Sequence, residues 1–181
     1  MERRHQSSLK KEKQVFDCPD ILISLAPAYT KAILQGTKTV ELRRRRVHAE
    51  VGTRVWLYSK VPTARVEGIA RIEQIYEGNI KGLWSEFSEG VGISKTEFEA
   101  YFKGCSKGYA IVLAGARAVI PAPDLQTMRR KFAGFHPPQF FKRLEPEEVK
   151  VLLKGCKLQS QNRDHSASRS IGLSRSRAIL E

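Results

Sequence analysis

Long apolar segments are absent from this 181-residue chain, and so is the pattern of a secretion signal. A membrane-spanning helix needs roughly 18 or more consecutive apolar residues, and no run here approaches that length. The first twenty residues are rich in charge and lack the apolar stretch of a secretory signal peptide. We therefore expect a cytoplasmic protein that has no membrane partner.

Cysteine and histidine are few and widely separated in the sequence. The four histidines and three cysteines are His5, Cys18, His48, Cys105, His136, Cys156 and His165. Zinc sites in proteins are built from closely spaced ligand pairs such as Cys-x-x-Cys, and the sequence contains no such pair. We therefore predict no metal site and no other cofactor, and we expect the thiols to be reduced and unpaired.

Positive charge is what the chain has in excess. Its 32 lysines and arginines outnumber 19 aspartates and glutamates, which gives a formal net charge of +13. Residues 21–154 alone hold 22 basic and 13 acidic side chains, so most of the excess lies in this central segment. A folded basic surface attracts polyanions, because neutralised phosphates release their counterions. We expect RNA, a nucleotide or a modified nucleoside as the partner, with DNA and a merely solvated surface as the alternatives.

The pattern of apolar residues divides the chain into three parts. Residues 1–20 are predicted to be a flexible leader, and residues 155–181 a disordered tail rich in serine and arginine. Between them, strand patterns cover 21–24, 39–43, 54–59, 65–78 and 108–120, and helix patterns cover 28–35, 94–102, 122–132 and 145–153. Ser94 and Glu97 have the spacing of a capping box. Several strands with a few short helices predict an α+β fold with a small curled or closed sheet over 21–154.

The densest group of charges is the stretch GTKTVELRRRR, residues 36–46. Alternation along the strand 39–43 puts Thr39, Glu41 and Arg43 on one face, beside Lys38 at the strand entrance. Lysine and arginine can hold a phosphate or a base carbonyl, and the carboxylate can accept from an exocyclic amine. In a catalytic site Glu41 would be the general base, and Lys38 would stabilise developing negative charge. The alternative is an ion network in solvent, which contributes little to stability.

The three arginines that follow the strand extend this group. Arg44, Arg45 and Arg46 lead into a loop, where consecutive arginines can follow a nucleic-acid backbone. We predict that they form a phosphate-contacting rim, which would set affinity and salt dependence rather than base choice. The alternative is a basic turn that stays solvated.

Two further segments supply candidate binding residues. Tyr58, Ser59 and Lys60 end a strand pattern, where the ring could stack on a base and the serine could donate to a phosphate. His136 and Gln139 lie in the loop FHPPQ, where the amide could contact a base edge. The alternatives are core packing for the tyrosine and simple exposure for the histidine.

Several segments of the sequence have the pattern of a known family. The segment ILISLAPAYTKAILQGTKTVELRRR resembles the opening of ASCH domains, which belong to the PUA-like superfamily. The similarity continues through VWLYSKVP, RVEGIARIEQI, GISKTEFEAYFKG and FHPPQFFKRL, and so spans about residues 20–145. It implies a small PUA-like β-barrel with short helices packed around it. It also implies a cleft, with Lys38, Glu41 and Arg43 at its mouth, that binds RNA, nucleotides or modified bases.

The family contains members with different activities. One branch resembles a small amidohydrolase acting on N4-acetylcytidine, in which the motif reads Lys-x-x-Thr-x-Arg and the threonine is the nucleophile. This chain has Glu41 at that position, and its nearest hydroxyl, Thr39, lies two residues earlier. Other members are described as ribonucleases or as RNA-associated regulators. We therefore predict an RNA- or nucleotide-binding module that acts in RNA metabolism or in regulating transcription or translation. The alternative is a metal-independent hydrolase in the same cleft, either a ribonuclease or an amidohydrolase.

Overall fold

Residues 19–159 are the part of the chain that this computed structural model describes, and they contain seven strands and five helices. The strands are β1 (Ile21–Leu25), β2 (Val40–Arg43), β3 (Arg54–Ser59), β4 (Arg65–Asn79), β5 (Lys107–Ile120), β6 (Phe141–Arg143) and β7 (Lys157–Leu158). The helices are α1 (Pro27–Leu34), α2 (Ile80–Phe87), α3 (Lys95–Tyr101), α4 (Leu125–Lys131) and α5 (Pro146–Gly155). No helix within the described residues is long and apolar enough to cross a membrane.

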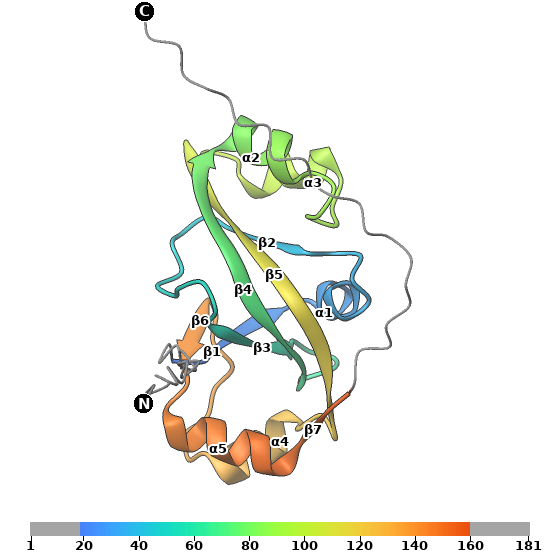
Figure 1. Ribbon diagram of the computed structural model, residues 1–181, viewed down its shortest axis with the longest axis vertical. Coiled ribbons are helices and arrows are strands. Elements are labelled where there is room, and N and C mark those ends of the chain that lie inside the picture. The colour runs from blue at the N-terminus through green and yellow to red at the C-terminus, as the bar shows by residue number, and fades with distance from the viewer. Residues whose placement is uncertain (1–18, 160–181) are drawn as a thin grey trace, which may run out of the picture.

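The strands form one curled sheet in the order β2-β5-β4-β3-β1-β6, and β7 adds to β5. Only the β1–β3 pair among these is parallel. The long strands β4 and β5 lose register at two places, between Ile69 and Arg71 and between Ile72 and Gln74. Such bulges bend a strand and increase its twist, so the two strands curl into a half-barrel (Figure 1). The prediction of an α+β fold with a small barrel-like sheet is confirmed.

The apolar side chains of the described residues pack into three clusters. The central cluster fills the curled sheet and includes Ile33 of α1. A second cluster lies between the sheet and the helices α4 and α5, and it includes Trp56 and Met128. A third packs α2 and α3 against β2 through residues such as Leu83 and Phe98. The two helix pairs therefore cover opposite ends of the half-barrel (Figure 1).

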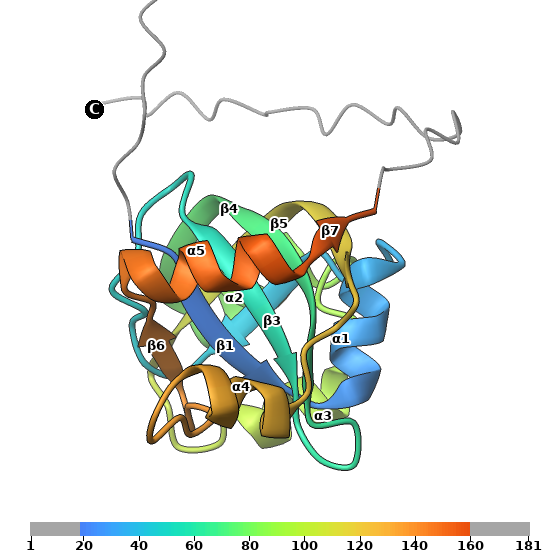
Figure 2. The same ribbon diagram turned by 90° about the horizontal axis from the view of Figure 1, so that it is seen from below.

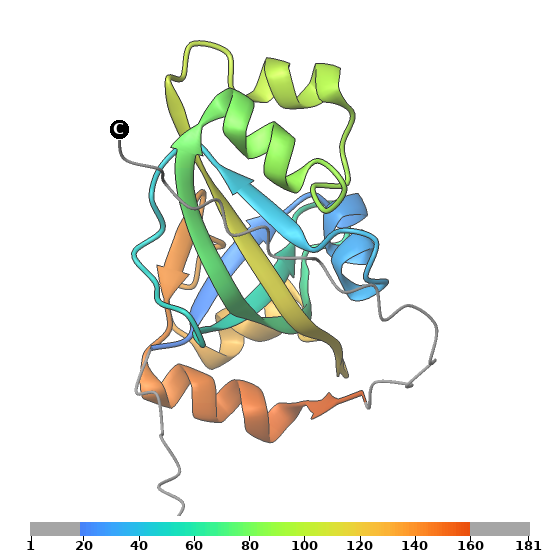
Figure 3. The same cartoon turned by 45° about the horizontal axis from the view of Figure 1, so that its top comes forward.

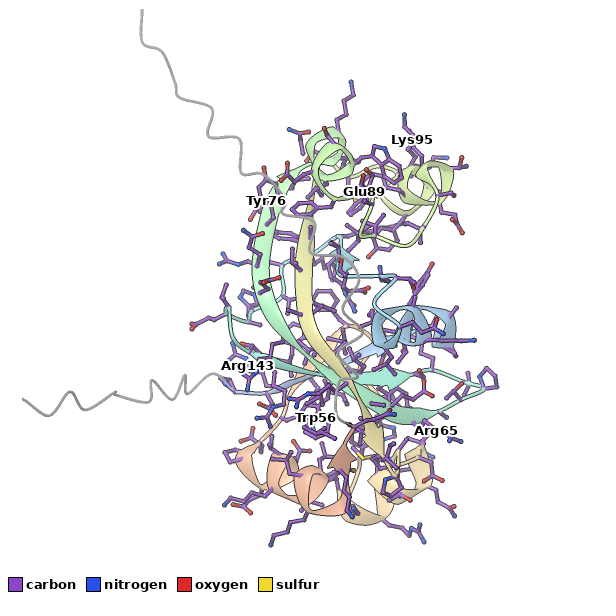
Figure 4. The ribbon with its side chains drawn as sticks, turned by 45° about the vertical axis from the view of Figure 1, so that its right-hand side comes forward. Trp56, Arg65, Tyr76, Glu89, Lys95 and Arg143 are labelled. Carbon is purple, nitrogen blue, oxygen red and sulfur yellow. The ribbon has the colours of Figure 1, made fainter. Side chains whose placement is uncertain are left out.

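Helices α4 and α5 bury a strand face that sequence alternation alone cannot assign. Trp56 is completely buried, and its indole Nε1 donates to the Asp20 carboxylate at 2.7 Å. In Figure 4 its ring points toward the helices at that end of the molecule, and in Figure 2 α5 crosses over β1 and β3. Because the barrel interior covers one face of β3 and these helices cover the other, β3 is buried on both faces.

Several local predictions are confirmed by the structure. Ser94 and Glu97 form the predicted capping box at the start of α3. Gly36 follows α1 with a φ of +77°, a left-handed conformation that glycine adopts without the strain of a side chain. The predicted strands and helices all occur, with ends that differ by up to three residues.

Three elements and one boundary differ from the predictions. The helix α2 was not predicted, although Asn79 caps it by accepting from the Gly82 amide. The short strands β6 and β7 depend on pairing with β1 and β5, which no local pattern shows. Residues 155–159, assigned to the tail by the sequence, end α5 and form β7 instead. The rest of the predicted tail and residues 1–18 of the leader lie outside the described residues.

Candidate functional site

A cleft of about 840 Å³ lies beside β2, between the β1–α1 junction and α3. Figure 3 shows β2 running between α1 and the pair α2 and α3. The cleft is lined by two anionic and five cationic side chains, which are Glu41, Glu97, Lys38, Arg43, Arg44, Arg45 and Lys60. A second cavity, of about 910 Å³, lies between α1 and β5. Lys38 borders both cavities, but Glu41 and Arg43 line only the first, to which we therefore assign the site.

The floor of the cleft is a row of three buried charges on and next to β2. Lys38, Glu41 and Arg43 are 3%, 7% and 7% exposed. The Lys38 Nζ lies 3.5 Å from Glu41 Oε2, and the Arg43 Nη2 lies 3.1 Å from Glu41 Oε1. The predicted alternation places Glu41 and Arg43 on one face of β2, and the two cations flank the carboxylate. Buried charges of this kind are costly unless they are paired, so the three side chains depend on one another.

The Lys38 ammonium is engaged by the protein itself. It donates to the carbonyl oxygens of Val40 and Val91, each at 2.7 Å, in addition to its contact with Glu41. These bonds tie the loop between α2 and α3 to β2. Burial lowers the pKa of Lys38, while the neighbouring Glu41 carboxylate opposes that shift and the Arg43 cation adds to it. Lys38 lines the cleft as predicted, and its contacts suit a group that positions Glu41.

The pH dependence of stability should report the burial of Lys38. Burial lowers the pKa of Lys38 in the folded protein below the ordinary lysine value of about 10.4. Between these two pKa values the unfolded chain binds more protons than the folded one, so the free energy of unfolding rises with pH. Lys38→Met is expected to lose this rise, measured by urea unfolding at several alkaline pH values. Parallel pH profiles for the two proteins would contradict the assignment.

Arg43 keeps donors that the described residues do not satisfy. Its Nη1 donates to the Phe140 carbonyl at 3.2 Å, and its guanidinium lies over the Phe140 ring at 5.4 Å. Nε and Nη2 are buried and have no hydrogen-bond partner within residues 19–159, although Nη2 is close enough to Glu41 for an ion pair. Nη2 thus forms an ion pair with Glu41 but no hydrogen bond, because a hydrogen bond requires a favourable angle at the donor and charge attraction does not. Unpartnered buried donors are uncommon and suit a ligand that supplies the acceptor.

The rim of the cleft is basic and aromatic. Arg44 and Arg45 are exposed, and Lys60 reaches the cleft from the end of β3. The Arg44 guanidinium lies 4.9 Å from the centre of the Tyr101 ring, and the Tyr101 hydroxyl donates to the Leu42 carbonyl at 3.2 Å. Burial raises the pKa of that hydroxyl. The rim thus offers cations for phosphates and an aromatic ring for a base.

Only some of the other predicted residues meet at this cleft. Gln139 lines it, whereas Arg46 and His136 are exposed outside it. Thr39 lines the second cavity, on the far side of α1. Thr39 and Glu41 therefore line different cavities, and the threonine hydroxyl does not share the cleft with the carboxylate.

The structure also removes two predicted residues from the cleft. Tyr58 is 2% exposed and packs in the cluster under α4 and α5, where burial raises its hydroxyl pKa. Ser59 is fully buried and donates a hydrogen bond to the Glu67 carboxylate, which lines the second cavity. Both residues were expected at a strand end near the ligand. The helices that cover β3 bury the ring, and the pairing of β3 with β4 turns the serine toward Glu67.

Three hydroxyl-bearing residues of the cleft were not predicted as site residues from the sequence. Ser24, Tyr29 and Tyr101 line the cleft from β1, α1 and α3. Both tyrosines lie at the apolar helical spacing of α1 and α3, which is typical of packing residues, and nothing local distinguishes Ser24 from other strand serines. Among residues 19–159 there is also no group of three or more His, Cys, Asp or Glu side chains arranged to hold a metal ion.

Comparison with known proteins identifies the family. No family model matches the chain. Over 140 residues it is 35% identical to an ASCH domain-containing ribonuclease of Zymomonas mobilis, which covers 76% of this chain and 94% of the relative. This chain belongs to the ASCH domain family. The family resemblance predicted from the sequence is therefore confirmed.

Solved structures agree with this assignment. The crystal structure of an ASCH protein from Zymomonas mobilis matches this ASCH domain with a TM-score of 0.74 at 33% identity, over 77% of this chain and 96% of that one. A serine-to-alanine variant of that protein matches with a TM-score of 0.73. A 116-residue segment of this ASCH domain is also 27% identical to the ribosomal protein uL22 of Ureaplasma parvum, of which it covers 37%.

Proposed function

We propose that this ASCH domain binds RNA in the 840 Å³ cleft and hydrolyses its phosphodiester backbone. The observation that supports this most directly is the buried row of Lys38, Glu41 and Arg43 beneath a rim of exposed cations. From the sequence, RNA binding was the main prediction and hydrolysis was the alternative. The ribonuclease relative, matched along nearly its whole length, is the reason for joining the two.

Binding would use the rim. The side chains of Arg44, Arg45 and Lys60 are free to contact phosphates, which supply most of the affinity of a protein for single strands. The rings of Tyr29 and Tyr101 line the same cleft and offer surfaces on which bases can stack without base preference.

The chemistry would use Glu41 and Arg43. In the proposed reaction Glu41 takes the proton of a ribose 2′-hydroxyl, and the resulting oxygen attacks the adjacent phosphorus. The bond from phosphorus to the 5′-oxygen breaks, solvent protonates that oxygen, and the other product carries a 2′,3′-cyclic phosphate. The unpartnered donors of Arg43 would stabilise the charge that builds up on the phosphoryl oxygens. Lys38 would hold the carboxylate in place from the other side.

The test uses end-labelled oligonucleotides of one sequence, made as RNA and as DNA. The RNA is expected to be cleaved in EDTA to fragments with 2′,3′-cyclic phosphate ends, and the DNA to stay intact because it lacks the attacking hydroxyl. Intact RNA that is nevertheless bound would reduce the function to binding. Cleavage that EDTA abolishes and a divalent metal restores would contradict the metal-independent reaction.

The amidohydrolase alternative is not part of this proposal. It needs a hydroxyl nucleophile where this chain has Glu41, and the nearby Thr39 hydroxyl lines the other cavity. Nothing in the cleft favours a modified nucleoside over RNA.

A further inference from the structure

Arg43 is held across the junction between the two edges of the curled sheet. The strands β2 and β6 stand at opposite ends of the strand order, and Arg43 is the last residue of β2 while Phe140 directly precedes β6. The Arg43 Nη1 donates to the Phe140 carbonyl at 3.2 Å, although the two residues are 97 positions apart in the sequence. Both residues line the cleft, so the cleft borders this junction.

The ring of Phe140 contacts the arginine as well as the carbonyl does. The Arg43 Cζ lies over this ring, 5.4 Å from its centre, within the distance at which a cation and an aromatic ring attract each other. A guanidinium is planar and its donors lie in that plane, so a ring over it restricts the orientation of the plane without using a donor. Nε and Nη2, which are buried and have no hydrogen-bond partner within residues 19–159, therefore remain for a ligand.

Phe140 is itself held in place by the core. Its ring meets the Phe141 ring edge-on, with 5.2 Å between the ring centres, and both rings pack against the central cluster inside the sheet. Phe141 pairs with Ile23 of β1, which joins this segment to the sheet. An arginine side chain loses much rotamer freedom when it is held in one conformation. Arg43 thus contacts a ring that its own neighbours already fix, before any ligand binds.

We infer that Phe140 is a positioning residue, which holds the Arg43 guanidinium in the orientation needed at the phosphoryl group of the substrate. The inference rests on the proposed function, since it gives Arg43 its orientation for the cleavage step. Donors stabilise a transition state best when they are aimed before its charge develops. Without the ring, Arg43 stays charged and close to Glu41 but is free to turn. The rate of cleavage then falls more than the affinity for RNA, because the exposed cations of the rim supply most of that affinity.

Phe140→Leu tests this role, with Phe141→Leu as the matched control. Both phenylalanines are half-buried against the central cluster, but of the two only Phe140 lines the cleft and lies beneath the guanidinium. Phe140→Leu is expected to lower kcat by about 5- to 30-fold, the rate equivalent of a desolvated cation–π contact, with KM nearly unchanged. Phe141→Leu is expected to keep the native kcat, and Phe140→Tyr, which keeps a ring, to restore most of it. Equal kcat values for the two leucine variants, or a Phe140→Tyr protein as slow as Phe140→Leu, would overturn the inference.

The nuclear magnetic resonance signal of the Arg43 side chain separates this inference from the proposed function. An aromatic ring shifts the Nε–H resonance of a nearby arginine, and in ¹⁵N-labelled protein the Arg43 resonance is identified by its absence from Arg43→Lys. Phe140→Leu is expected to move this resonance further than Phe141→Leu does, with no RNA present. Failure of the native protein to cleave RNA would contradict the proposed function but would leave this shift unaffected. An Arg43 resonance that Phe140→Leu does not move would overturn the positioning role, whether or not RNA is cleaved.

Discussion

Glu41→Gln is expected to stop RNA cleavage and to lower the free energy of unfolding by about 3 kcal/mol. The carboxylate is 7% exposed and lies between Lys38 and Arg43, so the neutral amide leaves two buried cations without a counter-charge. Loss of a general base alone lowers a rate by about 10²- to 10⁴-fold. Chemical unfolding measures the loss of stability. The loss of cleavage is measured at a temperature where near-UV circular dichroism shows that the variant is folded.

Glu97→Gln is the matched control for this experiment. Glu97 lines the same cleft and loses the same charge, but it is exposed and, within residues 19–159, bonds to Ser94 at the start of α3. Glutamine also serves at that position of a capping box, so stability should change little. A Glu97 variant as unstable or as inactive as Glu41→Gln would mean that cleft charge, and not the buried row, explains the effect. Full cleavage by a folded Glu41→Gln protein would remove Glu41 from the mechanism.

Replacing Arg44 and Arg45 together by alanine is expected to weaken RNA binding mainly through its salt dependence. Each phosphate contact to a single strand contributes about 0.7 to the slope of log affinity against log salt, so two lost contacts reduce that slope by about 1.4. Both side chains are exposed at the cleft rim, and neither belongs to the buried row of Lys38, Glu41 and Arg43. Fluorescence anisotropy with a labelled RNA at several salt concentrations measures the slope, and the stability should be nearly unchanged.

The paired substitution Arg129→Ala with Arg130→Ala controls for net charge. These two arginines are neighbours on α4, are exposed, and do not line the cleft. Figure 1 places α4 at the end of the half-barrel opposite α2 and α3. If both double variants reduce the slope equally, the attraction is a property of overall charge. A reduction confined to Arg44 and Arg45 supports a path for RNA across the cleft rim.

The local elements of the fold could be predicted because their causes are local. The capping box of α3 needs only Ser94 and Glu97 three residues apart, and the end of α1 needs only Gly36. The alternation in β2 correctly placed Glu41 and Arg43 on one face. The helix α2 was missed because the apolar pattern of the long strand β4 runs directly into it, with Asn79 as the one strong marker of its start.

The candidate site was predictable only where its residues are close in sequence. The stretch from Lys38 to Arg45 supplies most of the cleft's charge and was recognised from its composition. The prediction that Tyr58 and Ser59 contact the ligand was wrong because a strand pattern does not show which elements cover its end. Here the helices α4 and α5 bury Tyr58, and Ser59 donates to Glu67. Ser24 and Tyr101 join the cleft from separate strands and helices, so only the folded chain shows them together.

By itself the sequence determined the family, the α+β class, the excess of positive charge and the row of alternating charges on β2. These depend on composition, on periodicity and on short motifs, which are the same wherever the segments lie in space. Tertiary structure alone decided that Lys38 donates to the Val40 and Val91 carbonyls. It also decided that Ser24 borders the cleft and that its buried hydroxyl has no hydrogen-bond partner within residues 19–159. The physical reason is that burial and hydrogen-bond satisfaction depend on neighbours brought from distant parts of the chain.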